Sequence, residues 1–310
     1  MRLGFSVRVV GARIPSYDAR RWPERACLST SLVYLRDILT YLGTHRLRMY
    51  RMHSRLAPVP PGGEEESALA EVETCALELQ TTGALAGRLG VRLSFHPSSV
   101  VVLNAVNEDL VVRSRAHLAV LAAILDAMGL GDEAVVVVHV GGVYDGMQAA
   151  RERFLRRYGE LPEASRRRLV LENDDRRFSF RDVWGIHRAC GVRLVFDTLH
   201  HQVLNPERIP WTEALAMALG TWPQGVTPKV HVSSPRTELR PMASGGRVKM
   251  PTWTEHSDLV NPFEFVSFLR QTAGLRPFDV MLEAKARDLA VLKLREDLQR
   301  FAPEWAGRVE

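Results

Sequence analysis

The sequence predicts an α/β protein built as a single (β/α)8 TIM barrel. Three observations carry this prediction: apolar, strand-like runs alternate with helical stretches, eight such units fit into 310 residues, and no linker separates them. Unbroken alternation indicates parallel strands, and eight units favour a closed barrel. We therefore expect residues 1–310 to form one domain. A doubly wound open sheet is the alternative, but the first strand lacks the glycine-rich phosphate loop of that fold.

In the first half of the chain, short apolar runs predict four strands, at residues 2–7, 47–52, 91–95 and 134–140. The last of these reads AVVVVHV, and an unbroken valine run is typical of a strand covered on both faces. Apolar residues at helical spacing predict three helices between the strands, at residues 29–43, 64–90 and 107–128. The first begins at Ser/Thr and stops at Gly43, and the second has acids in its first turn, as helix termini favour.

In the second half, the predicted strands are residues 169–172, 192–197, 229–232 and 279–283. The predicted helices are residues 147–158, 179–190, 212–219 and 262–271, with one more at the C-terminal end. Gly191 follows the helix that starts at Ser179 and supplies its stop signal. Residues 233–258 show no periodicity, which predicts a long loop.

The composition is that of a soluble globular protein, with 46% hydrophobic and 25% charged residues. A formal net charge of +5 permits a polyanionic partner without requiring one, and we expect the arginine run at 166–168 to be a solvated helix end. Three widely spaced cysteines give no disulfide framework and fit a reducing compartment. The sequence has neither a secretory h-region nor a membrane-spanning apolar run, so we expect a cytoplasmic protein without a membrane partner.

Side chains that bind metal ions stand where the predicted strands end. From the third strand to the eighth they are His96, His139, Glu172, Asp197, His231 and Glu283, with His200 and His256 in the loops after the sixth and seventh strands. Barrel active sites lie at these C-terminal strand ends. Mixed imidazole and carboxylate ligands suit zinc or manganese, and several carboxylates indicate more than one ion. Such a cluster suits phosphoester hydrolysis.

Residues two before each strand-end ligand share its inward face, because side chains alternate along a strand. They are Ser94, Val137, Val170, Val195, Lys229 and Met281. Most are small or apolar and suit the filling of a barrel, but Lys229 does not. A buried lysine is costly as a cation, so we expect Lys229 to pair with a carboxylate or to be modified.

Short segments spread over nearly the whole chain form an ordered series: LGF at residue 3, YRM at 50, SFHP at 94, HVGG at 139, LEND at 171, DTLHH at 197, KVH at 229, HSD at 256 and LEAK at 282. This series resembles the ultraviolet damage endonucleases, which are related to endonuclease IV and the xylose-isomerase-like barrels. It implies a metal-dependent DNA repair endonuclease, a hydrolase that incises damaged double-stranded DNA on the 5′ side of ultraviolet photoproducts. It implies no obligate protein partner.

The resemblance also implies roles for the strand-end residues. Two to three divalent ions are implied, typically Mn²⁺ with Zn²⁺ or Mg²⁺ as alternatives, and the eight residues given above would be their ligands. A carboxylated Lys229 would be a further ligand, and Glu172, Lys229 and His231 would be the catalytic residues.

The chain departs from the family where the lesion is read. After the His-Pro of the third strand the family places a Gln-Tyr pair, and here Ser99 and Val100 stand there. Another side chain must then replace extruded bases. We expect DNA contacts from Arg51, Ser99, Tyr144, Arg247, Lys249 and Trp253, with the basic loop at 236–249 on phosphates. The alternatives are an abasic-site endonuclease of the endonuclease IV type and a sugar isomerase or epimerase.

Overall fold

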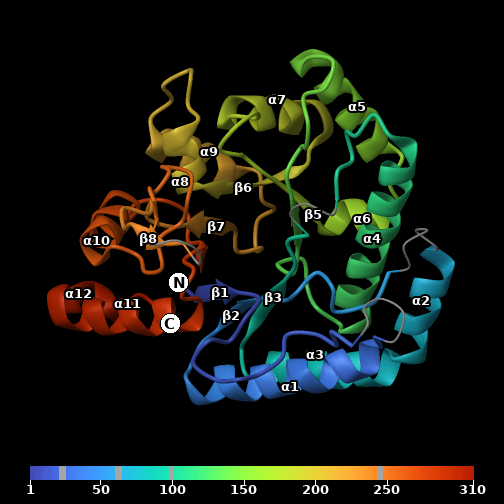
Figure 1. The fold of residues 1–310 in the computed structure, drawn as a ribbon, viewed down its shortest axis with the longest axis horizontal. Coiled ribbons are helices and arrows are strands. Elements are labelled where there is room, and N and C mark those ends of the chain that lie inside the picture. The colour runs from blue at the N-terminus through green and yellow to red at the C-terminus, as the bar shows by residue number, and fades with distance from the viewer. Residues whose placement is uncertain (21–25, 60–64, 98–100, 243–246) are drawn as a thin grey trace.

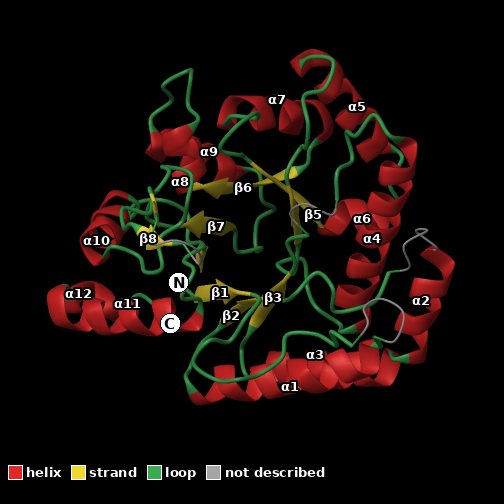
Figure 2. Cartoon of the chain, in the orientation of Figure 1, coloured by secondary structure: helices red, strands yellow, loops and turns green. Residues whose placement is uncertain are grey.

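The computed structural model describes residues 1–20, 26–59, 65–97, 101–242 and 247–310. Within these ranges, eight strands form one parallel sheet at the centre of the molecule (Figure 1, Figure 2). The strands of this sheet are β1 (Leu3–Ser6), β2 (Met49–Arg51), β3 (Arg92–Ser94), β4 (Val136–Val138), β5 (Leu169–Glu172), β6 (Arg193–Asp197), β7 (Lys229–Val232) and β10 (Asp279–Leu282).

The sheet closes into a barrel. Its order is β3-β2-β1-β10-β7-β6-β5-β4, and the two outer strands meet where Phe95 pairs with Val136 in a parallel bridge. Two backbone hydrogen bonds of 2.9 Å hold this seam, from Phe95 N to Val135 O and from Val137 N to Phe95 O. The predicted (β/α)8 barrel is therefore confirmed, and the alternative prediction of an open doubly wound sheet is wrong.

Helices surround the barrel on the outside (Figure 1). They are α1 (Leu28–Thr44), α2 (Glu65–Thr74), α3 (Ala76–Arg88), α4 (Glu108–Ala127), α5 (Met147–Gly159), α6 (Glu163–Arg168), α7 (Phe180–Cys190), α8 (Thr198–Val203), α9 (Trp211–Gly220), α10 (Pro262–Gln271), α11 (Asp288–Phe301) and α12 (Pro303–Ala306). Local signals fix several ends: Ser179 and Asp182 form a capping box on α7, and Gly191 ends α7 with a φ of 74°. Among the described residues, no helix is both long enough and apolar enough to cross a membrane.

Two predictions about elements were wrong, and a third was right only in part. The single helix expected at residues 64–90 is divided at Cys75, because α2 packs against α4 whereas α3 packs against α1. The loop expected at 233–258 contains a small antiparallel pair, β8 (Arg240–Pro241) and β9 (Val248–Lys249). The arginine run does end a helix, α6, and Arg166 and Arg167 are exposed as expected. Arg168 is instead 1% exposed, because it donates to Asp126 and to backbone carbonyls.

The barrel interior has an apolar half and a polar half. Val135, Val137, Val170 and Val195 pack together with Trp222, as strand alternation predicts for three of these valines. The polar half contains an ion pair and a hydrogen bond between side chains of strands that are not neighbours in the sheet. Arg92 of β3 pairs with Asp279 of β10 at 3.0 Å, and Lys229 of β7 donates to Ser94 of β3 at 2.9 Å. These bonds span the interior beneath the C-terminal strand ends.

Candidate functional site

The C-terminal strand ends open into a cleft of about 520 Å³, here called the strand-end cleft. Its lining residues come from many segments: Val7, Arg51, His53, Ser54, Arg55, His96, Pro97, His139, Glu172, His200, His256, Glu283, Lys285 and Arg287. Six of the eight predicted ligands line it directly. The other two, Asp197 and His231, are fully buried and interact with the lining residues His200 and Glu172. The fold thus gathers all eight into one place.

The strands place these side chains as the sequence predicts, with one exception. Glu172 and Asp197 end β5 and β6, His231 lies within β7, and His96, His139 and Glu283 follow β3, β4 and β10 closely. His200 was expected in a loop, but it lies in α8. Asp197 is the reason, because its side chain caps this short helix by accepting from the His200 backbone N–H at 2.8 Å.

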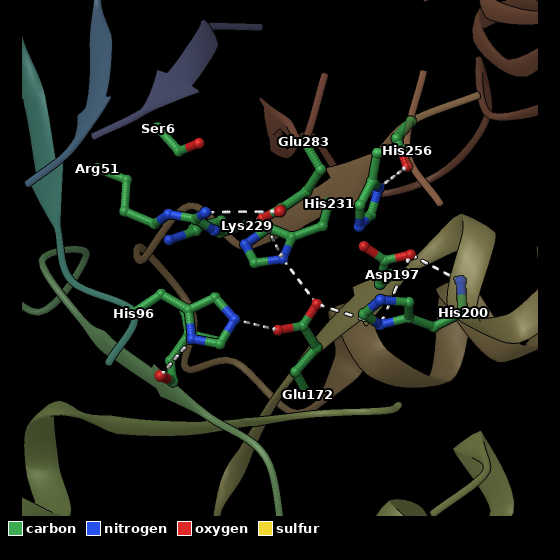
Figure 3. A network of polar contacts seen from close by, with 12 residues as sticks. Ser6, Arg51, His96, Glu172, Asp197, His200, Lys229, His231, His256 and Glu283 are labelled. Atoms are coloured by element: carbon green, nitrogen blue, oxygen red, sulfur yellow. Dashed lines mark hydrogen bonds and ion pairs between the residues drawn. The ribbon is translucent and has the colours of Figure 1, made fainter. Parts of the chain in front are cut away.

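Glu172 lies at the centre of the group, with imidazoles around its carboxylate (Figure 3). Its Oε1 accepts from His231 Nδ1 at 2.8 Å and lies 3.6 Å from His200 Nδ1. Its Oε2 lies 2.9 Å from His96 Nε2 and 3.6 Å from His139 Nε2. Burial opposes the charge of Glu172, but the neighbouring imidazoles of His231, His139 and His96 outweigh it and hold the pKa of Glu172 well below its usual value.

The donor atoms of this cluster fit divalent cations. Two groups, His96-His139-Glu172 and Glu172-Asp197-His200, each bring their ligand atoms within 4.8 Å of one another, and Glu172 belongs to both. In the described part of the chain, Asp197 Oδ2 and His231 Nε2 are buried atoms that make no hydrogen bond. Such atoms cost about 1–3 kcal/mol each, and a bound cation would satisfy them. Because Glu172 belongs to both groups, its carboxylate would serve two cation sites.

Hydrogen bonds orient the imidazoles from behind. His96 Nδ1 lies 3.0 Å from Val137 O, and His200 Nδ1 lies 2.9 Å from Asn173 O. His256 Nδ1 lies 2.7 Å from the hydroxyl of Ser233. Each bond fixes the ring through Nδ1, so Nε2 is the nitrogen that would bind a metal ion. Our sequence reasoning gave Asn173 no role, although it directly follows Glu172 at the strand end.

The charge on the imidazoles differs from one to the next. Burial lowers the pKa of His96 to about 4. For His200 burial acts in the same direction, but the carboxylates of Asp197 and Glu172 outweigh it and raise the pKa to about 9. Burial raises the pKa of Asp197 itself. The cluster therefore holds both neutral and cationic rings around its buried carboxylates.

Cations border the cleft on the β1, β2 and β10 side. Arg51 is buried and forms an ion pair with Glu283, so this predicted DNA-contact residue lies inside the cluster (Figure 3). Lys285 and Arg287 also line the cleft, and burial lowers the pKa of both. Sequence reasoning missed these two. The signal was present, because Lys285 lies two residues after Glu283 at the same barrel end.

Lys229 is buried as predicted, with 1% of its surface exposed. Its Nζ donates to Ser94 Oγ, and no described carboxylate lies within ion-pair distance of it. Burial lowers the pKa of Lys229 well below its usual value, and the charges of Arg92 and Arg51 act in the same direction. The expected carboxylate partner is absent among the described residues, which leaves a modified lysine as the other expectation.

The other predicted DNA-contact residues lie outside the cleft. Tyr144 is 55% exposed, stands 5.6 Å from the Arg153 guanidinium and borders a groove that also contains Arg176 and Arg177. Arg247 and Lys249 are exposed on the segment of β8 and β9, and Trp253, further along, is 72% exposed. Ser99 lies outside the described residues.

Fold and site together define a class, the (β/α)8 barrels with a cluster of histidines and carboxylates at the C-terminal end of the barrel. Comparison with known proteins narrows this class. The family model "UV-endonuclease UvdE" matches residues 24–304. The chain is 32% identical over 260 residues to a UV DNA damage endonuclease of Bacillus mycoides (strain KBAB4), covering 83% of this chain and 77% of the relative. The chain belongs to the UV-endonuclease UvdE family.

Further similarities agree with this assignment. A UV DNA damage endonuclease of Halalkalibacterium halodurans is 29% identical over 298 residues, which cover 93% of this chain and 86% of the relative. The crystal structure of SacUVDE superimposes with a TM-score of 0.81 at 26% identity, covering 97% of this chain and 98% of that one. Endonuclease IV from Thermus thermophilus has a TM-score of 0.55 at 17% identity, with 96% and 100% coverage, and shares the fold.

Proposed function

We propose that this protein is a divalent-metal-dependent DNA repair endonuclease that incises double-stranded DNA on the 5′ side of ultraviolet photoproducts. Its relatives carry the name UV DNA damage endonuclease. The observation that carries the proposal is the pair of ligand groups that share Glu172 within the strand-end cleft. Two to three ions, preferably Mn²⁺, would be held by His96, His139, Glu172, Asp197, His200, His231, His256 and Glu283.

The chain's own residues position the scissile phosphate. When bound, divalent ions lower the pKa of water and stabilise the charge that develops on the phosphate and the leaving 3′ oxygen. The cations Arg51, Lys285 and Arg287 border the same cleft and would draw the phosphodiester into it. Glu172 Oε1 and His231 Nδ1 lie 2.8 Å apart. These two side chains would hold the bound ions next to that phosphate.

We further propose that Lys229 carries a carbamate. An uncharged lysine amine adds to CO2 and releases a proton, and burial favours the uncharged amine of Lys229. The product is an anion that suits a site beside metal ions. Intact-mass measurement under native conditions at neutral pH should show one added CO2, which is lost on acidification and absent in Lys229→Arg. An unmodified native mass would contradict this proposal.

Outside the cleft, DNA would contact exposed side chains from separate segments of the chain. Tyr144 and Trp253 are exposed aromatic side chains suited to stacking on bases, and Arg247 and Lys249 are exposed cations suited to phosphates. Ser99 belongs to the same proposal from sequence alone. We also propose that residues 1–310 act as one domain, since backbone bonds join Leu3 to Glu310 and Glu310 to Met1.

The test is incision of three duplexes that are identical except for a photodimer, an abasic site or no lesion. We expect Mn²⁺-dependent nicking on the 5′ side of the photodimer, little nicking of the undamaged duplex, and loss of activity with EDTA. Faster nicking at the abasic site would favour the abasic-site alternative, which the Ser99-Val100 sequence keeps open. A metal-loaded protein that cuts neither lesion but converts a ketose would establish the sugar isomerase or epimerase alternative.

A further inference from the structure

The segment that joins β7 to α10 forms a hairpin whose base lies at the strand-end cleft. Pro235 and His256 pair in an antiparallel bridge, and Arg236 N donates to Glu255 O at 2.6 Å. Further along the segment, β8 and β9 pair in antiparallel register. The second arm therefore ends at His256, a side chain of the cleft lining. The hairpin is therefore joined directly to the segment that carries a candidate metal ligand.

The hairpin has two chemically different faces. Arg240 lies opposite Lys249, Pro241 lies opposite Val248, and Met242 N continues the pairing to Arg247 O at 2.8 Å. Because side chains alternate along each strand, these pairs define which residues share a face. One face, the basic face, contains Arg240, Met242, Arg247 and Lys249. The other, the apolar face, contains Leu239, Pro241, Val248 and Met250.

The apolar face is open to solvent in this protein. Leu239 is 53% exposed, Val248 is 55% exposed and Met250 is 68% exposed. Exposed apolar side chains are common singly, but several on one face mark a contact surface. Nothing in the hairpin's own fold requires them to be apolar, because the pairing of β8 with β9 is made by the backbone. The apolar face is therefore available for a partner.

The charge on the opposite face identifies the partner as a polyanion. Arg240 and Lys249 both pair with the single carboxylate of Glu255, which leaves this group net positive, and Arg247 adds a further cation. The cleft beneath the hairpin is bordered by more cations, among them Arg51 and Arg287. Duplex DNA needs cations along its backbone, and apolar side chains can enter between its bases where stacking is weakened.

We propose that the hairpin of β8 and β9 enters the duplex at the lesion, with its apolar face against the weakened base stack and its basic face toward the phosphates. The inference rests on the proposed function and adds the element that selects damaged DNA. Insertion is favourable at a lesion because the bases there are already partly unstacked, whereas an undamaged duplex would have to be unstacked first. The anchoring at His256 then sets the distance from the lesion to the cleft.

The test compares two variants that alter opposite faces of the hairpin. Val248→Thr together with Met250→Gln makes the apolar face polar, and Arg247→Gln removes one charge from the basic face. Binding is measured by fluorescence anisotropy on a photodimer duplex and on its undamaged counterpart, over a salt series. We expect the apolar-face variant to bind the photodimer duplex about tenfold more weakly. Its binding to undamaged duplex and its salt dependence should stay as in the wild type.

The basic-face variant should behave differently. Arg247→Gln is expected to weaken both duplexes alike and to reduce the slope of log K against log salt by about 0.9. An apolar-face variant that binds the photodimer duplex like the wild type, or weakens both duplexes equally, overturns the inference. So does a change from dimer to monomer in sedimentation without a change in lesion binding, because the apolar face would then serve a second copy of the chain.

Incision of the same photodimer duplex by the wild type separates this inference from the proposed function. If the wild type does not incise, the proposed function fails, and the binding data still decide the role of the hairpin. If the wild type incises and the apolar-face variant retains full lesion preference, the hairpin inference alone fails.

Discussion

Glu172→Gln is the substitution with the largest expected effect on incision. The amide keeps the size of the side chain but removes one anionic ligand from both candidate groups, His96-His139-Glu172 and Glu172-Asp197-His200. Loss of residues that merely orient a ligand weakens metal sites by 10–100-fold, so we assign the loss of a ligand itself about 100-fold per ion. For two ions the effects multiply to roughly 10⁴-fold in kcat/KM at limiting metal, or about 5.5 kcal/mol.

The assay is incision of a single-photodimer duplex over a Mn²⁺ titration, with metal affinity measured separately by calorimetry. Glu160→Gln is the control, since Glu160 is an exposed carboxylate that pairs with Arg115 on the outside of the barrel. The metal titration curve of Glu172→Gln should shift to higher concentration, while that of Glu160→Gln should coincide with the wild type. Incision by Glu172→Gln within tenfold of the wild type at limiting metal would refute the reasoning.

Three further predictions concern stability. Mn²⁺ at a hundredfold its Kd should stabilise the protein by about 2.7 kcal/mol. With an unfolding entropy of roughly 0.65 kcal/mol/K for a chain of this length, Tm should rise by about 4 °C in calorimetry, and EDTA should reverse the rise. Arg168→Met removes the guanidinium that donates to Ala134 O and Leu130 O and leaves Asp126 with Arg167 as its guanidinium partner, so Tm should fall by about 6 °C. The exposed Arg166→Met should leave Tm unchanged. The Arg20 side-chain hydrogen bond lowers the pKa of Asp18 to about 2, so the stability that it adds is complete above the unfolded pKa of about 3.9 and is lost as pH falls through about 2. The difference in urea midpoint between wild type and Asp18→Asn should therefore be large at neutral pH and shrink toward pH 2; a difference independent of pH would contradict this.

The sequence predicted the barrel and the cluster because both depend on short-range rules. The strands and helices expected from periodicity are largely present in the structure. The carboxyl ends of parallel strands must then meet at one end of a closed barrel. A candidate ligand such as Glu172, placed last in its strand, can therefore be found without coordinates. Lys229 was recognised as buried for the same reason, since it is two residues before His231 on the same face.

The features that sequence reasoning missed depend on contacts between distant segments. The bend at Cys75 follows from two different neighbouring helices, and no local signal marks it. Arg168 is buried because it donates to carbonyl oxygens of the turn between α4 and β4, which is distant in sequence. From the arginine run alone, a solvated cation was expected. The hairpin of β8 and β9 has strands of two residues, too short for period-two alternation to be visible. Its two faces emerge only from the pairing register.

The seam of the barrel has a consequence for how the protein opens. One parallel bridge and two backbone bonds join the first and last strands of the sheet, and His96 and His139 stand immediately beyond that join. A narrow join of this kind is where local opening should start, so the amides of Phe95 and Val137 should exchange with solvent faster than those of the other barrel strands. An ion held by both histidines would fasten the two edges together and slow that exchange. Amide protection at the seam would thus report the loading of the cluster without any DNA present.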